Sequence, residues 1–352
     1  MSTAAPQPPA APRRSAGRLV LRALAVLLVL GVAATGAGVW AVIRALGPAA
    51  ESAPPVRYDV APGASLRRVA EELEARGVIR SALALRGLAR WQGTAGRLHA
   101  GEYELSPTWP AARVLEQMVA GRVVTYPLTL PEGIAAAEIA ARVEQAGLAR
   151  AEDFLAVVRD PQVAAEFGVE GTTLEGYLFP ETYHLPRGLS ARQIAKVFVD
   201  QFLRVWKEIE PKARERGMSM REVVTLASIV EKETGVGDER PLVASVFHNR
   251  LRRGMRLESD PTTIYGIPDF DGNLRRVHLE DETNAWNTYR ITGLPPTPIA
   301  SPGAASLRAV VEPAESDYLF FVSRNDGSHV FARTFAEHVR NVNRFQRSRR
   351  SP

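Results

Sequence analysis

The longest apolar stretch of the chain lies near its N-terminus. Residues 23–43 carry no charged side chain over 21 positions, which corresponds to about 31 Å of α-helix. That length is enough to cross the hydrocarbon core of a bilayer. The pattern therefore predicts one membrane-spanning helix over 23–43.

The charges around this apolar stretch predict its orientation. Arg13, Arg14, Arg18 and Arg22 precede it, and no acidic residue occurs before Glu51. Basic residues stay on the cytoplasmic side, so we expect a disordered cytoplasmic tail over 1–22, a single pass through the plasma (inner) membrane, and an exported remainder. The alternative is a cleaved signal peptide, although the apolar core of such peptides is usually about 7–15 residues.

Beyond a Pro-rich linker over 44–55, the polar and apolar positions indicate a small module over 56–125. Alternation at 56–60 predicts a strand, and Ser65 is placed to begin a helix that ends at Gly77. A second strand near 98–105 and a second helix ending near Gly121 follow. Mixed strands and helices of this kind indicate an α+β fold.

A longer second region follows over 126–345. Its pattern predicts a strand at 123–130, a helix at 134–146, and a mostly helical segment at 154–202 that breaks at 171–186. Aromatic residues in that break either line a sugar site or pack the loop. The turn Asn325-Asp326-Gly327 predicts a hairpin. Residues 346–352 are expected to be a disordered tail.

The most informative helix begins at Ser219, which forms a capping-box pattern with Glu222. An almost entirely apolar run at 223–230 predicts deep burial, and the helix then ends in Glu231-Lys232-Glu233-Thr234 before a glycine. Carboxylates at a helix C-terminus face the negative end of the dipole, and burial favours their neutral form. Such a carboxyl suits a general acid, although an ordinary solvated helix end would show the same residues.

Several motifs downstream carry a family resemblance. They are Asn249-Arg250-Leu251, Asp260-Pro261-Thr262, Asn287-Thr288-Tyr289 and Gly293-Leu294-Pro295-Pro296, after Ala227–Thr234. In this order they resemble the endolytic murein transglycosylase family (YceG-like), and the resemblance covers nearly all of the exported chain. It implies a LysM-like module at 56–125 and a catalytic domain at 126–345.

The resemblance implies cleavage of the β-1,4 bond between N-acetylmuramic acid and N-acetylglucosamine without water, leaving a 1,6-anhydro end. Glu233 is the expected catalytic acid and base, because Glu-Thr resembles the Glu-Ser pair of lysozyme-like lytic transglycosylases. Glu231 is the second choice, or a neighbour that keeps Glu233 protonated. The expected substrate-binding residues are Glu231, Asn249, Arg250, Asp260, Asn287, Thr288 and Tyr289. Termination of nascent strands beside membrane-bound synthases is also implied.

Other functions remain as alternatives or are disfavoured. A peptidoglycan-binding scaffold would use the module alone, and a glycoside hydrolase would need a second carboxylate, for which Asp260 is the candidate; its alternative role is to tie the turn before Pro261. Without the four arginines of the tail the chain is close to neutral, which argues against nucleic-acid binding. The chain has no cysteine, and its histidines lack metal-binding spacing, so we expect neither a metal nor another cofactor.

Overall fold

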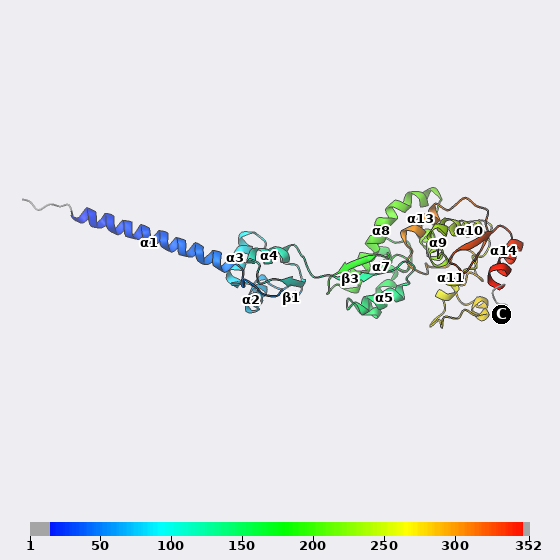
Figure 1. Cartoon of the computed structure of the whole chain (residues 1–352), viewed down its shortest axis with the longest axis horizontal. Coiled ribbons are helices and arrows are strands. Elements are labelled where there is room, and N and C mark those ends of the chain that lie inside the picture. Colours follow the sequence, from blue (N-terminus) through cyan, green and yellow to red (C-terminus); the bar gives the residue numbers. More distant parts are fainter. Residues whose placement is uncertain (1–14, 348–352) are drawn as a thin grey trace, which may run out of the picture. The chain divides into compact units, whose positions relative to one another are not determined.

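The structure is a computed structural model that describes residues 15–347 of the chain (Figure 1). The chain divides into two compact units between Val124 and Thr125. Each sheet in the described range has two strands, and helices make up most of the remaining regular structure. The predicted α+β class with one N-terminal apolar helix is confirmed.

The first unit begins with α1 (Ser15–Leu46), a helix of 32 residues. Its segment Leu19–Leu46 is long and apolar enough to cross a membrane, a criterion of length and composition that a signal sequence also meets. The helix begins at Ser15. Residues 15–22, which were predicted to belong to a disordered tail, are therefore helical and continuous with the apolar stretch. Residues 1–14 of that tail lie outside the described range.

A small module follows α1 in the first unit. It contains β1 (Val56–Val60), α2 (Leu66–Ala75), α3 (Ala82–Trp91), β2 (Gly101–Leu105) and α4 (Ala111–Val119). The strands pair antiparallel, with Tyr58 opposite Tyr103. As predicted, the Ser65 hydroxyl caps α2 by accepting a hydrogen bond from the Arg68 backbone N–H at 3.3 Å. The helix α3 is not among the elements expected from the sequence.

The second unit contains, in chain order, β3 (Tyr126–Thr129), α5 (Ala136–Gln145), α6 (Ala151–Val158), α7 (Pro161–Glu166), β4 (Thr182–Leu185), α8 (Ala191–Glu215), α9 (Met220–Glu233), η1 (Gly237–Glu239), α10 (Arg240–Arg252), α11 (Asp260–Tyr265), α12 (Arg276–Glu280), α13 (Ala304–Val311), β5 (Phe320–Ser323), β6 (His329–Ala332), α14 (Phe335–Val342) and η2 (Asn343–Arg347). The strand β4 lies inside the segment predicted as a break, and it pairs antiparallel with β3. The hairpin β5–β6 forms around Asn325 and Gly327, which both have positive φ. Residues 348–352 of the predicted C-terminal tail lie outside the described range.

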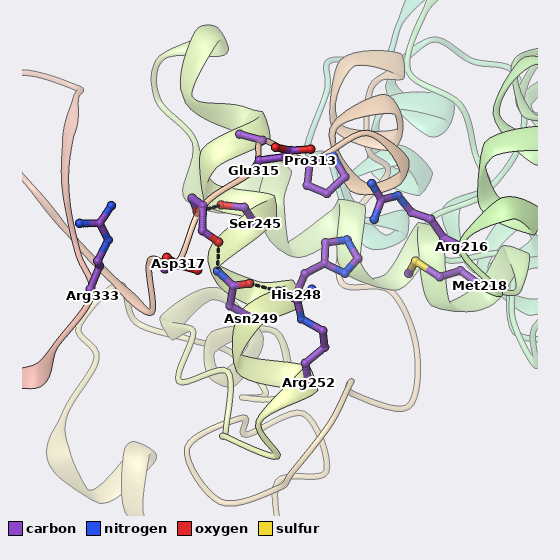
Figure 2. A pocket seen from close by; sticks show the side chains of 12 residues that line it. Arg216, Met218, Ser245, His248, Asn249, Arg252, Pro313, Glu315, Asp317 and Arg333 are labelled. Carbon is purple, nitrogen blue, oxygen red and sulfur yellow. Dashed lines mark hydrogen bonds between the residues drawn. The ribbon is translucent and has the colours of Figure 1, made fainter.

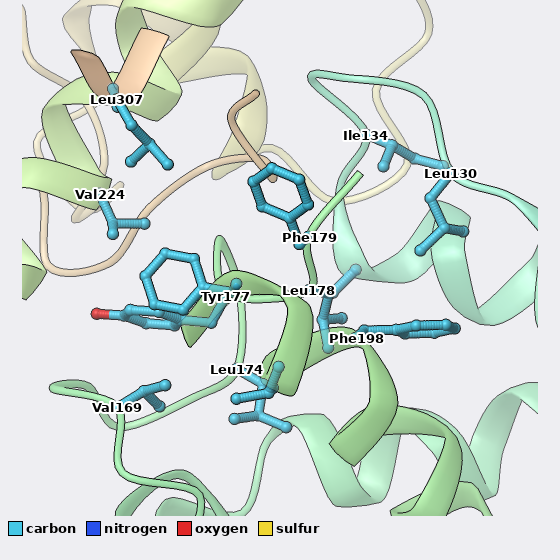
Figure 3. Packing of buried hydrophobic residues seen from close by; sticks show 14 of the residues in the cluster. Leu130, Ile134, Val169, Leu174, Tyr177, Leu178, Phe179, Phe198, Val224 and Leu307 are labelled. Carbon is cyan, nitrogen blue, oxygen red and sulfur yellow. The ribbon is translucent and has the colours of Figure 1, made fainter. Parts of the chain in front are cut away.

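The aromatic residues of the 171–186 break belong to the core. Tyr177 and Tyr183 are buried, and each hydroxyl donates to a backbone carbonyl, Tyr177 to Glu170 at 2.6 Å and Tyr183 to Phe179 at 2.7 Å. Figure 3 shows Tyr177 and Phe198 among the side chains that fill this part of the core. Of the two alternatives, the structure therefore shows loop packing for these two tyrosines.

The helix α9 is the element around which the second unit is built. It packs against α8, α10, α11 and α13, and Val224 from α9 lies near Leu307 from α13 (Figure 3). The predicted capping box is confirmed, since the Ser219 hydroxyl and the Glu222 carboxylate cap each other's backbone N–H groups. Burial of an apolar side chain contributes about 1.5–3 kcal/mol, so this packing fixes the position of the polar end of the helix.

Candidate active site

Glu233 is the last residue of α9. The chain leaves the helix at Thr234, which adopts an extended conformation rather than the glycine-closed turn that the following Gly235 suggests. The Thr234 hydroxyl donates to the Val230 carbonyl at 2.7 Å, which satisfies one of the free carbonyls at the helix end. The buried body of α9 thus presents Glu233 at its exit from the core.

The carboxyl group of Glu233 has an altered acidity. Burial, followed by the nearby charge of Asp260, raises its pKa to about 7, while a hydrogen bond from Ser259 and the charge of Arg250 oppose this change. The Ser259 hydroxyl donates to Glu233 Oε1 at 2.5 Å. Because the pKa lies near neutrality, the group is able both to give and to accept a proton there.

Ser259, which contacts the Glu233 carboxyl, was not expected from the sequence. It is buried, and its backbone N–H donates to the Thr288 hydroxyl at 3.0 Å. The residue before it, Glu258, has a φ of 51°, a left-handed conformation that costs a non-glycine residue free energy. The only local signal was its position directly before the Asp260-Pro261 helix start.

Two predicted binding residues, Asn287 and Thr288, are fully buried. The Thr288 hydroxyl also contacts that of Thr262 at 2.7 Å, while Asn287 accepts from Thr263 at 3.0 Å and donates to three backbone carbonyls. Satisfied buried networks of this kind rigidify their surroundings. In the structure both side chains position the start of α11, and their contact with substrate stays a prediction.

Asp260 and Tyr289 form a pair on the exposed side of α11. The Tyr289 hydroxyl donates to Asp260 Oδ1 at 2.7 Å. Asp260 is exposed and lies close enough to Glu233 for its charge to raise the pKa of that carboxyl. The structure therefore brings Glu233, Asp260 and Tyr289 together, as expected for residues of one site.

Asn249 and Arg250 on α10 hold backbone segments in place. Asn249 Nδ2 donates to the carbonyls of Ser316 and Tyr318 at 2.9 and 2.8 Å, and Arg250 donates to the carbonyls of Arg256, Leu257 and Leu319 at 2.7–3.0 Å. Asn249 lines a cavity of about 750 Å³ together with Ser245 and His248 (Figure 2). Arg250 also pairs with Glu258 at 2.9 Å. These contacts give both residues a positioning role, and substrate binding by them stays a prediction.

Glu231 is held inside the protein. Its side chain is 6% exposed, and it pairs with Arg240 at 3.0 Å while accepting a hydrogen bond from the Gly303 backbone N–H at 2.9 Å. The neighbouring Lys232 donates to the Gly133 carbonyl at 3.2 Å. A carboxylate with these partners fastens the end of α9 to the start of α10 and to the loop before α13.

A further buried carboxyl, Glu175, was not expected to be unusual. Burial raises its pKa to about 7, against hydrogen bonds from the Tyr265 hydroxyl at 2.9 Å and the Ala136 backbone N–H at 3.0 Å. It therefore links the start of α5 to the end of α11. Its partners lie 39 and 90 positions away in the sequence, so no local pattern could have revealed it. Within residues 15–347, no cluster of three or more His, Asp or Glu side chains is suited to a metal ion.

Known proteins resemble this chain over most of its length. The model of the YceG-like family matches residues 58–344. A protein of Bacillus subtilis named endolytic murein transglycosylase is 29% identical over 299 residues, covering 80% of this chain and 82% of that protein. One of the same name from Streptococcus pneumoniae is 27% identical over 322 residues, covering 82% of this chain and 58% of that protein.

A solved structure agrees with these matches. The crystal structure of a YceG-like protein from Listeria monocytogenes superposes with a TM-score of 0.56 at 30% sequence identity, covering 82% of this chain and 100% of that one. Because the family model spans most of the chain, the family expected from the sequence motifs is confirmed. This protein belongs to the YceG-like family.

Proposed function

We propose that this protein is an endolytic murein transglycosylase that cleaves the β-1,4 bond between N-acetylmuramic acid and N-acetylglucosamine in peptidoglycan. The names of the relatives support the predicted enzyme class, a murein transglycosylase. The observation that carries the proposal for this chain is Glu233, a carboxyl at the end of a buried helix whose pKa is raised to about 7.

The proposed reaction uses one carboxyl group twice. Protonated Glu233 gives its proton to the glycosidic oxygen as the bond from that oxygen to C1 of the muramic residue breaks. The C6 hydroxyl oxygen of the same residue bonds to C1, and the Glu233 carboxylate takes the hydroxyl proton. The products are a 1,6-anhydro end and a free 4-hydroxyl, with no water consumed. A group with a pKa near the working pH is suited to both transfers.

The neighbours of Glu233 favour this reaction over hydrolysis. Glycoside hydrolases generally use two carboxyl groups about 5–9.5 Å apart. Glu231 is paired with Arg240, and Asp260 accepts the Tyr289 hydroxyl. In our proposal Asp260 and Tyr289 line the substrate and help keep Glu233 protonated, and neither acidic neighbour acts as a nucleophile.

The rest of the chain is proposed to hold this site near the membrane. Residues 23–43 would cross the plasma membrane with the N-terminus in the cytoplasm, and 44–55 would link them to a LysM-like, glycan-binding module at 56–125. The catalytic domain at 126–345 would then act on strands outside the membrane. We propose that it ends nascent strands beside peptidoglycan synthases.

The test is product analysis by mass spectrometry after incubation of full-length protein in detergent with purified glycan strands. We expect 1,6-anhydro-N-acetylmuramic ends from the wild type and a loss of at least about a hundredfold in Glu233→Gln, which lacks the acid. Glu138→Gln, an exposed change on α5, should retain full activity. Undiminished cleavage by Glu233→Gln would contradict the assignment, and strand binding without cleavage by the wild type would instead indicate a scaffold.

A further inference from the structure

The helix α3 of the first unit has two apolar faces. Ala82, Leu85 and Ala89 are buried in the module core. The other side carries Leu83, Ala84, Gly87 and Trp91, with Leu88 at the boundary, where it also packs against the module core. We call these five residues the α3 outer face. A surface helix normally has polar residues on the side away from the core, so the composition of this face requires another explanation.

Two large side chains of this face, Leu83 and Trp91, are mostly exposed. Leu83 is 76% exposed and Trp91 is 84% exposed. A single apolar residue at the surface is ordinary, but a contiguous apolar surface marks a binding site for a partner or a membrane. Here the exposed residues continue into a groove of about 650 Å³, whose lining is apolar apart from Ser81.

The other wall of the groove is the end of α1, through Ala41, Val42, Ala45 and Leu46. Short-range contacts join that end to the module. Leu46 packs against the module core, Pro48 forms a β-bridge with Ile79, and Arg80 donates to the Pro48 carbonyl. The α3 outer face is therefore held directly beside the point where the apolar helix ends.

The sequence segment that contains α3 carries charges of one sign. From Arg76 to Gly101, both included, the chain contains five arginines and no acidic residue. Arg80, Arg90 and Arg97 among them are exposed. Tryptophan is enriched at the level of lipid headgroups, and arginine stems extend along apolar surface while the guanidinium reaches the phosphates. An apolar face with basic flanks is typical of a segment that lies on an anionic bilayer.

We propose that the α3 outer face is a membrane-docking surface, with Leu83 and Trp91 inserted at the headgroup level of the leaflet into which α1 emerges and the arginines on lipid phosphates. The proposal rests on the proposed membrane anchor. Two contacts, α1 through the bilayer and α3 on its surface, would fix the orientation of the module with respect to the membrane. One helix alone would leave the module free to rotate.

The absence of cysteine allows a site-specific test in the full-length chain. Single variants Leu83→Cys and Trp91→Cys would carry an environment-sensitive fluorophore. The protein would be reconstituted at low density into phosphatidylethanolamine–phosphatidylglycerol vesicles, with a fraction of the lipids bearing a headgroup-level nitroxide quencher. Asp59→Cys, exposed on β1, is the matched control on the module, and Ala33→Cys in α1 reports insertion of the anchor through a deeper nitroxide.

We expect quenching at positions 83 and 91 to be at least about twofold stronger than at position 59. Arg86→Gln with Arg90→Gln should weaken quenching at position 91 in these vesicles more than in uncharged phosphatidylcholine. Equal quenching at positions 59, 83 and 91, with position 33 inserted, would overturn the docking surface and leave the anchor intact. No insertion at position 33 would overturn both. If the fluorophore became buried only as protein density rises, and the lipid nitroxide did not quench it, a second copy of the chain would cover the face.

Discussion

At the scale of single side chains, burial and three neighbours, Ser259, Asp260 and Arg250, set the pKa of the Glu233 carboxyl. The pKa that they produce, about 7, predicts the pH dependence of cleavage. The general acid must be protonated in the free enzyme, so kcat/KM should fall by about tenfold per pH unit above pH 7. Initial rates from pH 5 to 9 test this, and a midpoint near the ordinary value of 4.5 would contradict it.

Ser259 allows a second test at this scale. Its hydroxyl donates to Glu233 and stabilises the charged carboxylate, which lowers the pKa. Removal of the hydroxyl in Ser259→Ala should therefore raise the pKa and move the alkaline decline of kcat/KM to higher pH. Ser245→Ala, a buried serine on α10 with other partners, is the matched control and should leave the midpoint unchanged. A midpoint shifted to lower pH in Ser259→Ala would contradict the assigned role.

The same pKa has a consequence for stability. A carboxyl whose folded-state pKa lies above its unfolded value stabilises the fold below the unfolded value, and that contribution is lost as pH rises from about 4.5 to about 7. In Glu233→Gln this loss is absent, so the variant should gain stability relative to wild type as pH rises, by up to about 3 kcal/mol. Urea unfolding at pH 5 and pH 8 measures it, and a wild-type advantage that grows with pH would contradict it.

At the scale of elements, the ion pair between Glu231 and Arg240 joins the end of α9 to the start of α10. Arg240→Met should leave a buried carboxylate without its cation and destabilise the unit by about 3 kcal/mol. The double variant Glu231→Gln/Arg240→Met should recover much of that loss, because both charges are then gone. Denaturant unfolding measures the free energies, and a single variant as stable as wild type would contradict the fastening role of the pair.

The elements that the sequence predicted are those with strong local signals. The Ser219–Glu222 capping box and the apolar run behind it sufficed for α9, and Ser65 and Gly77 sufficed for α2. The helix α3 was not expected because Gly87 lies in its middle, and glycine in a helix interior is unfavourable. In the site, Asn249 holds backbone carbonyls that lie 67 and 69 positions away, and such long-range pairing leaves no local pattern. Substrate binding by Asn249 stays a prediction.

At the scale of the whole molecule, each unit has its own core. The cluster around α9 contains residues from Leu128 to Val311, and the module cluster contains residues from Tyr58 to Met118. A fragment of residues 125–352 should therefore fold alone and melt cooperatively. Circular dichroism on heating tests this, with the same fragment carrying Phe198→Ala as a control that should melt at lower temperature. A non-cooperative melt of the unsubstituted fragment would contradict the independence of its core.

The central claim is that Glu233 cleaves glycan strands without water. The most direct measurement is mass spectrometry of the products formed in ¹⁸O-labelled water. In the proposed reaction the substrate's own C6 oxygen bonds to C1 and no oxygen comes from water. We therefore predict anhydro ends that contain no ¹⁸O from the wild type, and no anhydro ends from Glu233→Gln. Reducing ends that carry one ¹⁸O atom would contradict the claim and indicate a hydrolase that uses a second carboxylate.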